Sequence, residues 1–228
     1  VKTQVVGEYS PVVEEQAQRV REFMNYQIMH VMEEYDEDLD QMLFYLPLAG
    51  SAFKKVYYDE NLQRAVSKFV APEDLIVPYY TTDLDSCPRI THLIKMPENE
   101  VKKLQAIGFY RDVKVDSGNN LVGNSGLDSE LEKLEGIEPS YDTGEVCHLY
   151  EVHCNLDLDG FEDTNQEGEF TEVKLPYIVT IDTNSENILS IRRNFEEDDP
   201  MKKKIAYFVH FKFLQGLGFY GFGLTHMI

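Results

Sequence analysis

Apolar residues in the first part of the chain recur at steps of three and four, the spacing of one face of an α-helix. Ser10 and Pro11 provide a helix start, because serine caps free N–H groups and proline favours the first turn. The helix is expected to face a core through Val13, Ala17, Val20, Met24, Ile28 and Val31. A second helix should end near Pro47 and Gly50, with one apolar side made of Leu39, Met42, Leu43 and Leu46.

From Phe53 the period changes to two residues, which indicates β-strands. Residues 54–59 and 64–70 read as a hairpin, and further strands are expected over 75–77 and 89–96. Two helices followed by this small sheet are predicted to form a first unit, residues 1–96. A short helix over 97–107 should follow, because Pro97 and Glu98 suit its start and Gly108 its end.

A second region rich in strand patterns begins after the loop residues 116–126 and a short acidic helix or turn over 127–135. Residues 146–158 alternate in polarity, which predicts a strand with one buried face. Residues 175–181 and 188–193 form a predicted hairpin, and 206–214 a closing strand. The expected fold class is therefore α+β.

The chain has 228 residues, of which 43% are hydrophobic and 27% charged, as in folded proteins. No apolar run is long enough for a membrane helix, so we expect no membrane association. The net charge of −20 disfavours a sequence-independent grip on nucleic acid. Because the chain begins with Val1 and ends among apolar residues, we expect it to be a fragment.

Three cysteines, an odd number without paired spacing, favour free thiols in a reducing compartment: Cys87, Cys147 and Cys154. Cys147 and His153 share one face of the predicted strand, but about 20 Å separates its ends, too far for a shared metal. Asp163 to Gly168 imitates the start of a calcium loop, yet Lys174 stands where the bidentate acid belongs. No metal is expected.

Gly216, Gly218 and Gly221 spell G-x-G-x-x-G after a strand-like run. One interpretation is the fingerprint of a nucleotide-binding enzyme, which needs a helix after the glycines and an acidic residue further on. The chain ends first, and Phe219 and Tyr220 would crowd a pyrophosphate. We therefore expect a glycine-jointed hinge that includes Gly223, no cofactor and no catalytic machinery.

Opposite charges are concentrated around Pro200, where an acidic run is followed by a lysine run. This block is either a solvated loop or a docking surface for a partner or a second subunit. The residues concerned are Arg192, Arg193, Glu196, Glu197, Asp198, Asp199, Lys202, Lys203 and Lys204.

Several sequence blocks together resemble the portal (head-to-tail connector) proteins of tailed double-stranded-DNA bacteriophages. They occur in order over nearly the whole chain, at residues 43–58, 69–75, 88–92, 100–111, 175–181, 191–195, 199–200 and 216–223. The resemblance implies a homo-oligomeric ring of typically twelve subunits at one capsid vertex of the virion, assembled in the host cytoplasm. DNA would pass through the channel during packaging and ejection.

The resemblance also implies a wing, a helical stem and a β-rich clip. The wing would be residues 1–96, the first stem helix and its loop 97–135, and the clip 136–210. Residues 211–228 would be the joint into a second, truncated stem helix. The portal would be no enzyme: ATP hydrolysis would belong to the terminase large subunit, which docks on the clip charges, and head-completion, tail adaptor and capsid proteins would be further partners.

Overall fold

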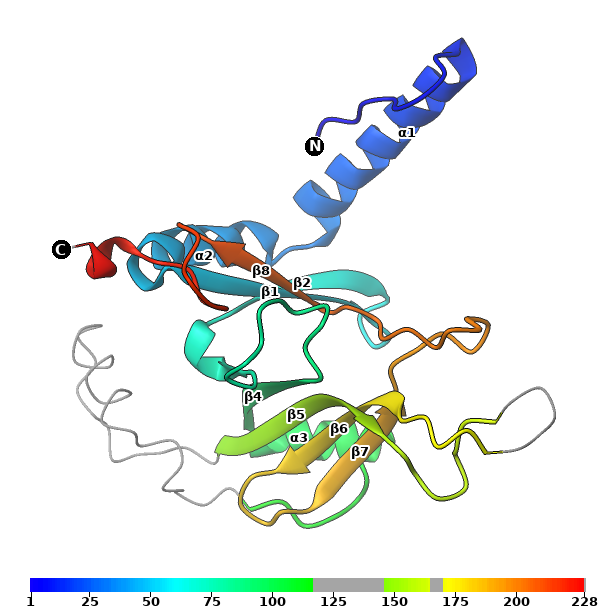
Figure 1. The fold of residues 1–228 in the computed structure, drawn as a ribbon, viewed down its shortest axis with the longest axis vertical. Helices are drawn as coiled ribbons and strands as arrows, with labels where there is room; N and C mark the ends of the chain where they lie inside the picture. The colour runs from blue at the N-terminus through cyan, green and yellow to red at the C-terminus, as the bar shows by residue number, and fades with distance from the viewer. Residues whose placement is uncertain (117–145, 165–169, 228) are drawn as a thin grey trace. The chain divides into compact units, whose positions relative to one another are not determined.

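The computed structural model describes residues 1–116, 146–164 and 170–227. Within these ranges the chain forms helices and two antiparallel sheets, so the expected α+β class is confirmed (Figure 1). The chain divides into two compact units, and each is described by itself. The first comprises Val1–Pro72 with Ala206–Ile228, and the second Glu73–Ile205.

The first unit is built on a three-stranded sheet with the order β2-β1-β8. β1 (Ser51–Asp59) pairs antiparallel with β2 (Arg64–Val70) on one side and with β8 (Phe208–Lys212) on the other. The predicted hairpin of β1 and β2 is confirmed, and its turn is held by Asp59, which accepts the N–H of Asn61 at 2.9 Å. The third strand comes from the far end of the chain.

α2 (Tyr35–Ala49) packs on β1 and β2. Met42 is buried at this contact, and the ring of Tyr45 lies 5.6 Å from that of Phe69. The helix ends as predicted at Gly50, whose φ of 81° is the left-handed conformation that glycine adopts after a helix. Leu43 was expected on the apolar side but is 53% exposed, because the packed side is set by Met42 and Tyr45.

Acidic side chains at the start of α2 cover the outer edge of β2. Asp38 accepts the N–H of Phe69 at 2.8 Å, and Glu34 accepts that of Ser67 at 3.4 Å. Glu34 also pairs with Arg64 at 2.6 Å. Since unpaired edge amides invite pairing with other chains, these contacts protect the edge.

α1 (Pro11–Tyr26) begins as predicted, with Ser10 Oγ accepting the N–H of Val13 at 3.3 Å. It continues into the π-helical turn Gln27–Val31. The expectation that its apolar stripe faces a core is wrong for the described chain: no residue of α1 is buried there, and Val20 is 52% exposed. The N-terminal residues run back along the helix (Figure 1). Helical periodicity reports an apolar face but not the surface that covers it.

The second unit contains a five-stranded antiparallel sheet, order β3-β4-β5-β6-β7, and the helix α3 (Glu98–Ala106). Its strands are β3 (Leu75–Ile76), β4 (Arg89–Pro97), β5 (Val146–Leu156), β6 (Leu175–Asp182) and β7 (Ile188–Arg193). The predicted strands, the hairpin of β6 and β7 and the short helix are thus confirmed, with ends shifted by a few residues. The linker Pro72–Asp74 is a 3-10 helix.

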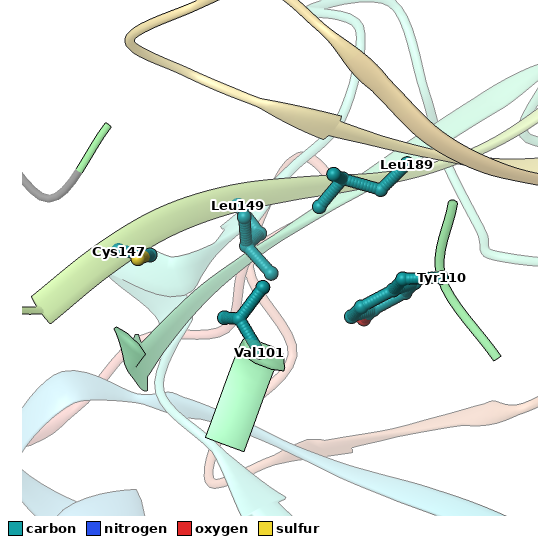
Figure 2. Packing of buried hydrophobic residues seen from close by; sticks show 5 residues of the cluster. All are labelled: Val101, Tyr110, Cys147, Leu149 and Leu189. Atoms are coloured by element: carbon teal, nitrogen blue, oxygen red, sulfur yellow. The ribbon is translucent and has the colours of Figure 1, made fainter. Parts of the chain in front are cut away.

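The core of this unit forms where α3 and the segment after it pack on the sheet (Figure 2). It consists of Val101, Tyr110, Cys147, Leu149 and Leu189. Cys147 and Leu149 lie on the odd-numbered face of β5, which is the more polar face by sequence, so the alternation predicted the strand but not which of its faces is buried. Burial, with the nearby Asp182 carboxylate, raises the pKa of the Cys147 thiol to about 11. This cysteine is therefore a core side chain and an unreactive thiol.

The structure divides the chain differently from the expected boundaries of 1–96 and 136–210. β4 pairs with β5 along its whole length and so belongs to the second unit. β8 pairs with β1 and belongs to the first. Strand patterns indicate that a segment is a strand but not which strand is its neighbour, so sequence order misplaced both. The expected elements over 117–135 lie outside the described residues.

Candidate functional site

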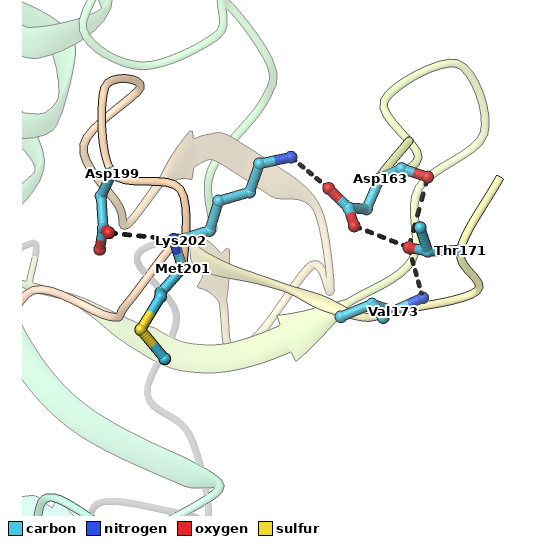
Figure 3. A network of polar contacts seen from close by, with 6 residues as sticks. All are labelled: Asp163, Thr171, Val173, Asp199, Met201 and Lys202. Atoms are coloured by element: carbon cyan, nitrogen blue, oxygen red, sulfur yellow. Dashed lines mark hydrogen bonds and ion pairs between the residues drawn. The ribbon is translucent and has the colours of Figure 1, made fainter. Parts of the chain in front are cut away.

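The charged run after β7 folds into a tight turn around Asp199 and Pro200 (Figure 3). The Asp199 carboxylate accepts the N–H groups of Lys203 and Met201, each at 3.0 Å. These backbone hydrogen bonds hold the pKa of Asp199 below its ordinary value. Asp199 is therefore an acceptor that shapes the turn, and the lysines project from a fixed backbone.

Lys202 joins this turn to the segment before β6 by an ion pair with Asp163 (Figure 3). The other Asp163 oxygen accepts the hydroxyl of Thr171 at 2.7 Å. The hydrogen bond from Lys202, and after it that from Thr171, lowers the pKa of Asp163. Asp163 was the first residue of the calcium-like pattern. In the structure its carboxylate is bound by the Lys202 ammonium group and the Thr171 hydroxyl. Residues 165–169 of that pattern lie outside the described residues.

Lys204 fixes the loop before β4. Its Nζ donates to the carbonyl oxygens of Leu84 at 2.7 Å and Cys87 at 3.0 Å. Asp83 tightens the same loop by accepting the N–H of Ser86 at 2.7 Å. The side chain of Lys204 thus stabilises the loop before β4, in addition to any contact with a partner.

A half-open pocket of about 360 Å³ lies beside the turn of residues 199–204, called the lysine turn below. The loop before β4 and the first residues of β6 form its other walls. The pocket lies entirely within the second unit. Its volume is within the range of small-ligand pockets. Its lining consists of Asp85, Ser86, Cys87, Pro88, Asn155, Val173, Lys174, Leu175, Pro176, Met201, Lys202 and Lys204.

The two arginines of the charged block have neighbours within the second unit. The Arg192 guanidinium lies 3.4 Å from the ring centre of Phe109 and donates to the Phe109 carbonyl at 3.1 Å. Arg193 pairs with Glu197, and both side chains are well exposed. Stacking of Arg192 anchors the segment after α3, whereas an exposed pair such as Arg193 with Glu197 adds little stability.

Three residues of the predicted contact set project from the turn region as exposed charges. They are Glu196, Asp198 and Lys203. Their role toward a partner stays a prediction. Their side chains make no hydrogen bond or ion pair within the described residues, and Lys203 contributes only its charge near the Asp199 carboxylate.

The C-terminal glycines pack against the end of α2. A side chain at Gly221 would approach the Leu214 carbonyl to 2.7 Å, and one at Gly223 would approach the Gly50 nitrogen to 2.7 Å. Thr225 Oγ1 donates to the Leu48 carbonyl at 2.9 Å. The described stretch continues into a three-residue 3-10 helix, Leu224–His226, so it lacks the helix that a dinucleotide fingerprint requires.

The four predicted joint glycines are not equivalent. Gly216, Gly221 and Gly223 each approach backbone closely, but a side chain at Gly218 would meet nothing within 4 Å. Gly218 is therefore not needed for packing within the described chain. The expected second stem helix is not formed by the described residues either, because the stretch folds back onto the Gly50 region.

The buried Ser51 and the half-buried His210 form a polar pair that sequence analysis missed. His210 Nε2 lies 3.1 Å from Ser51 Oγ, and this oxygen accepts the N–H of Gly221 at 2.8 Å. Ser51 is 1% exposed, which closes it to a substrate. The pair therefore holds the C-terminal stretch in place through hydrogen bonds, and Ser51 is not a catalytic nucleophile with His210 as its base.

Sequence signals were strong for the lysine turn and weak for its partners. The run of lysines after an acidic run is visible in the sequence, but Leu84 and Cys87 contribute only backbone carbonyls, which leave no side-chain signature. Lys202 and Asp163 are 39 residues apart, and only the tertiary fold brings them together.

Among the described residues, no helix is both long and apolar enough to cross a bilayer. No three or more His, Cys, Asp or Glu side chains in the described ranges are grouped so that they could hold a metal ion. A comparison of the chain with protein-family models gives no match, and a comparison with curated proteins gives none.

Proposed function

We propose that the chain is part of a subunit of a bacteriophage portal, a non-enzymatic ring that conducts double-stranded DNA through one capsid vertex. The observation that carries the proposal is the order and spacing of the portal-like sequence blocks, which extend from residue 43 to residue 223. In this proposal the three-stranded unit contributes to the wing and the five-stranded unit forms the clip, with α3 as the first stem helix.

The charge of the chain supports passage of DNA without capture. With 41 acidic and 21 basic residues, the net charge is −20. A basic channel would bind the phosphate backbone through counterion release, whereas an acidic one lets it slide.

The exposed stripe of α1 supports assembly into an oligomer. Val13, Val20 and Met24 of this stripe are 37%, 52% and 41% exposed. Apolar side chains clustered on an exposed helix face mark interaction surfaces, and in a ring each subunit is completed by its neighbours.

The decisive experiment is negative-stain electron microscopy of the full-length protein, with the mass measured in solution. The proposal requires rings with a central hole and a mass that is a high multiple of the subunit. A protein that forms no species larger than a dimer at micromolar concentration would overturn the proposal.

The predicted contact charges are tested in the same assay by the variant Glu196→Gln, Asp198→Asn, Lys203→Gln. Exposed pairs contribute about 0.2–1 kcal/mol each, so we expect the concentration for half-assembly to rise about two- to fivefold. The matched control is Asp36→Asn, Asp40→Asn, Lys68→Gln, which changes the same charges at exposed positions of the first unit. Equal assembly of both variants would remove the charged turn from the subunit or partner interface.

A further inference from the structure

The pocket beside the lysine turn has a positive charge that is held in place. An ammonium group has three N–H donors, and Lys204 uses two of them on the Leu84 and Cys87 carbonyls. Both partners are neutral, so no carboxylate of the described residues neutralises Lys204 in a recorded ion pair. One N–H and a full positive charge thus remain at the pocket wall.

Lys174 adds a second cation to the same wall. It is exposed, and the described residues record no ion pair for it. The third lysine, Lys202, is neutralised by Asp163. Among the described residues, the lining therefore presents two lysines that pair with no carboxylate, against the single carboxylate of Asp85, on a chain whose overall charge is strongly negative.

Apolar side chains form much of the remaining wall, beside the polar Ser86 and Asn155. Met201 is 72% exposed and Val173 is 53% exposed, and Pro88 and Pro176 also line the pocket. Exposed apolar side chains around a fixed cation are suited to a ligand that carries a carboxylate beside apolar groups. A bare phosphate would leave this apolar surface in water.

We propose that this pocket binds an extended acidic peptide segment of a partner protein, with a carboxylate on Lys204 and Lys174 and an adjoining apolar side chain on Met201 and Val173. A nucleic acid is a poorer occupant, because the acidic chain repels a long polyanion. The inference rests on the proposed function only for the identity of the partner, which would be a protein of the packaging assembly.

The test uses a defined probe, the peptide acetyl-Leu-Glu-Leu-Glu-Leu-amide, titrated into the isotope-labelled full chain and followed by amide chemical shifts. The isosteric control replaces both Glu by Gln. A charge-assisted hydrogen bond contributes about 1.5–3 kcal/mol, so we expect the Glu peptide to bind about tenfold or more tightly. Saturable shifts should cluster at Ser86, Val173 and Lys174. Equal binding of the two peptides, or shifts elsewhere, would overturn the proposal.

Variants separate binding from folding. Lys174→Gln removes an exposed charge and should weaken the Glu peptide about three- to tenfold, the effect of one partly exposed charge. Lys203→Gln, which changes a lysine outside the lining, should leave the affinity unchanged. An unchanged affinity in Lys174→Gln, or an equal loss in both variants, would contradict a site at this pocket.

Inorganic phosphate and a twelve-nucleotide oligothymidylate are titrated as competitors. If either competitor displaces the peptide only at concentrations far above the peptide concentration, the result supports a peptide site. If either competitor binds more tightly than the peptide, the proposal is overturned. Rings without peptide binding would refute this inference alone. Peptide binding to a protein that forms no rings would refute the portal proposal and leave the pocket assignment intact.

Discussion

At the scale of single residues, a half-buried histidine contacts β1 and the C-terminal stretch of the first unit. The His210 ring lies 4.4 Å from that of Phe53 and 4.7 Å from that of Phe219. Burial, and secondarily Lys212, lowers the pKa of His210 from 6.5 to about 4. The neutral ring can share a proton with Ser51, whereas a charged one would have to be accommodated among aromatic side chains.

This pKa predicts a pH-dependent stability. The unfolded chain takes up the proton near pH 6.5, but the folded chain does so only near pH 4. The contribution of His210 is therefore complete above pH 6.5 and is lost as the pH falls towards 4. Urea unfolding at several pH values between 7.5 and 4.5 gives the free energy of unfolding as a function of pH. The contribution of His210 is the difference between the slopes of this free energy against pH in the wild type and in His210→Gln.

The exposed residue His30 provides the control for this measurement. His30→Gln should retain the wild-type slope, and His210→Gln should show a flatter one. If His210→Gln lost stability on acidification as steeply as the wild type, the low pKa would be refuted.

At the scale of elements, the C-terminal stretch is held by close backbone approach. Ser51 Oγ accepts the Gly221 N–H, and the Phe213 N–H donates to the Gly50 carbonyl at 3.0 Å. Leu214 and Phe222 exchange two backbone hydrogen bonds of 3.2 and 2.8 Å. These contacts leave no room for a side chain at Gly221, so glycine is required there by space.

Alanine substitutions test this packing. Gly221→Ala should lower the free energy of unfolding by about 1–3 kcal/mol, because the added methyl group overpacks the site. Gly218→Ala is the matched control: its side chain would meet nothing within 4 Å, so we expect a change within about 0.5 kcal/mol. Chemical denaturation gives both values. Equal effects would mean that the stretch is not docked on the Gly50 region.

At the scale of the whole molecule, the second unit is an insertion between two parts of the first. The chain leaves the first unit after Pro72 and returns at Ala206, and β8 then pairs with β1. Because a continuous segment forms the second unit and its own core, it has what an independent folding unit requires.

Residues 73–205 expressed alone are therefore expected to unfold in one cooperative transition. A shorter segment, 98–205, lacks β3 and β4 and exposes the edge of β5, so it should not fold. Circular dichroism and denaturant titration distinguish the two. Absence of a transition in 73–205 would mean that the first unit is needed for its stability.

The sequence predicted most elements, because their signals are local. Ser10 before Pro11 marks the start of α1, Gly50 marks the end of α2, and the alternation over residues 146–156 marks β5 as a strand. It could not predict that no residue of α1 is buried within the described chain, since a 3.6-residue period is the same whatever covers the helix. The lysine turn was visible as a charge run, but its pocket was not.

Local patterns were enough to predict the α+β class, most strands and helices, and the positions where charges and glycines concentrate. That β4 pairs with β5, that β8 pairs with β1, and that Lys204 binds the carbonyls of Leu84 and Cys87 became visible only in the folded chain. Propensity and periodicity act between neighbours in sequence. Strand pairing and hydrogen bonds to backbone carbonyls join groups far apart in the chain, and those groups carry no distinctive side chain.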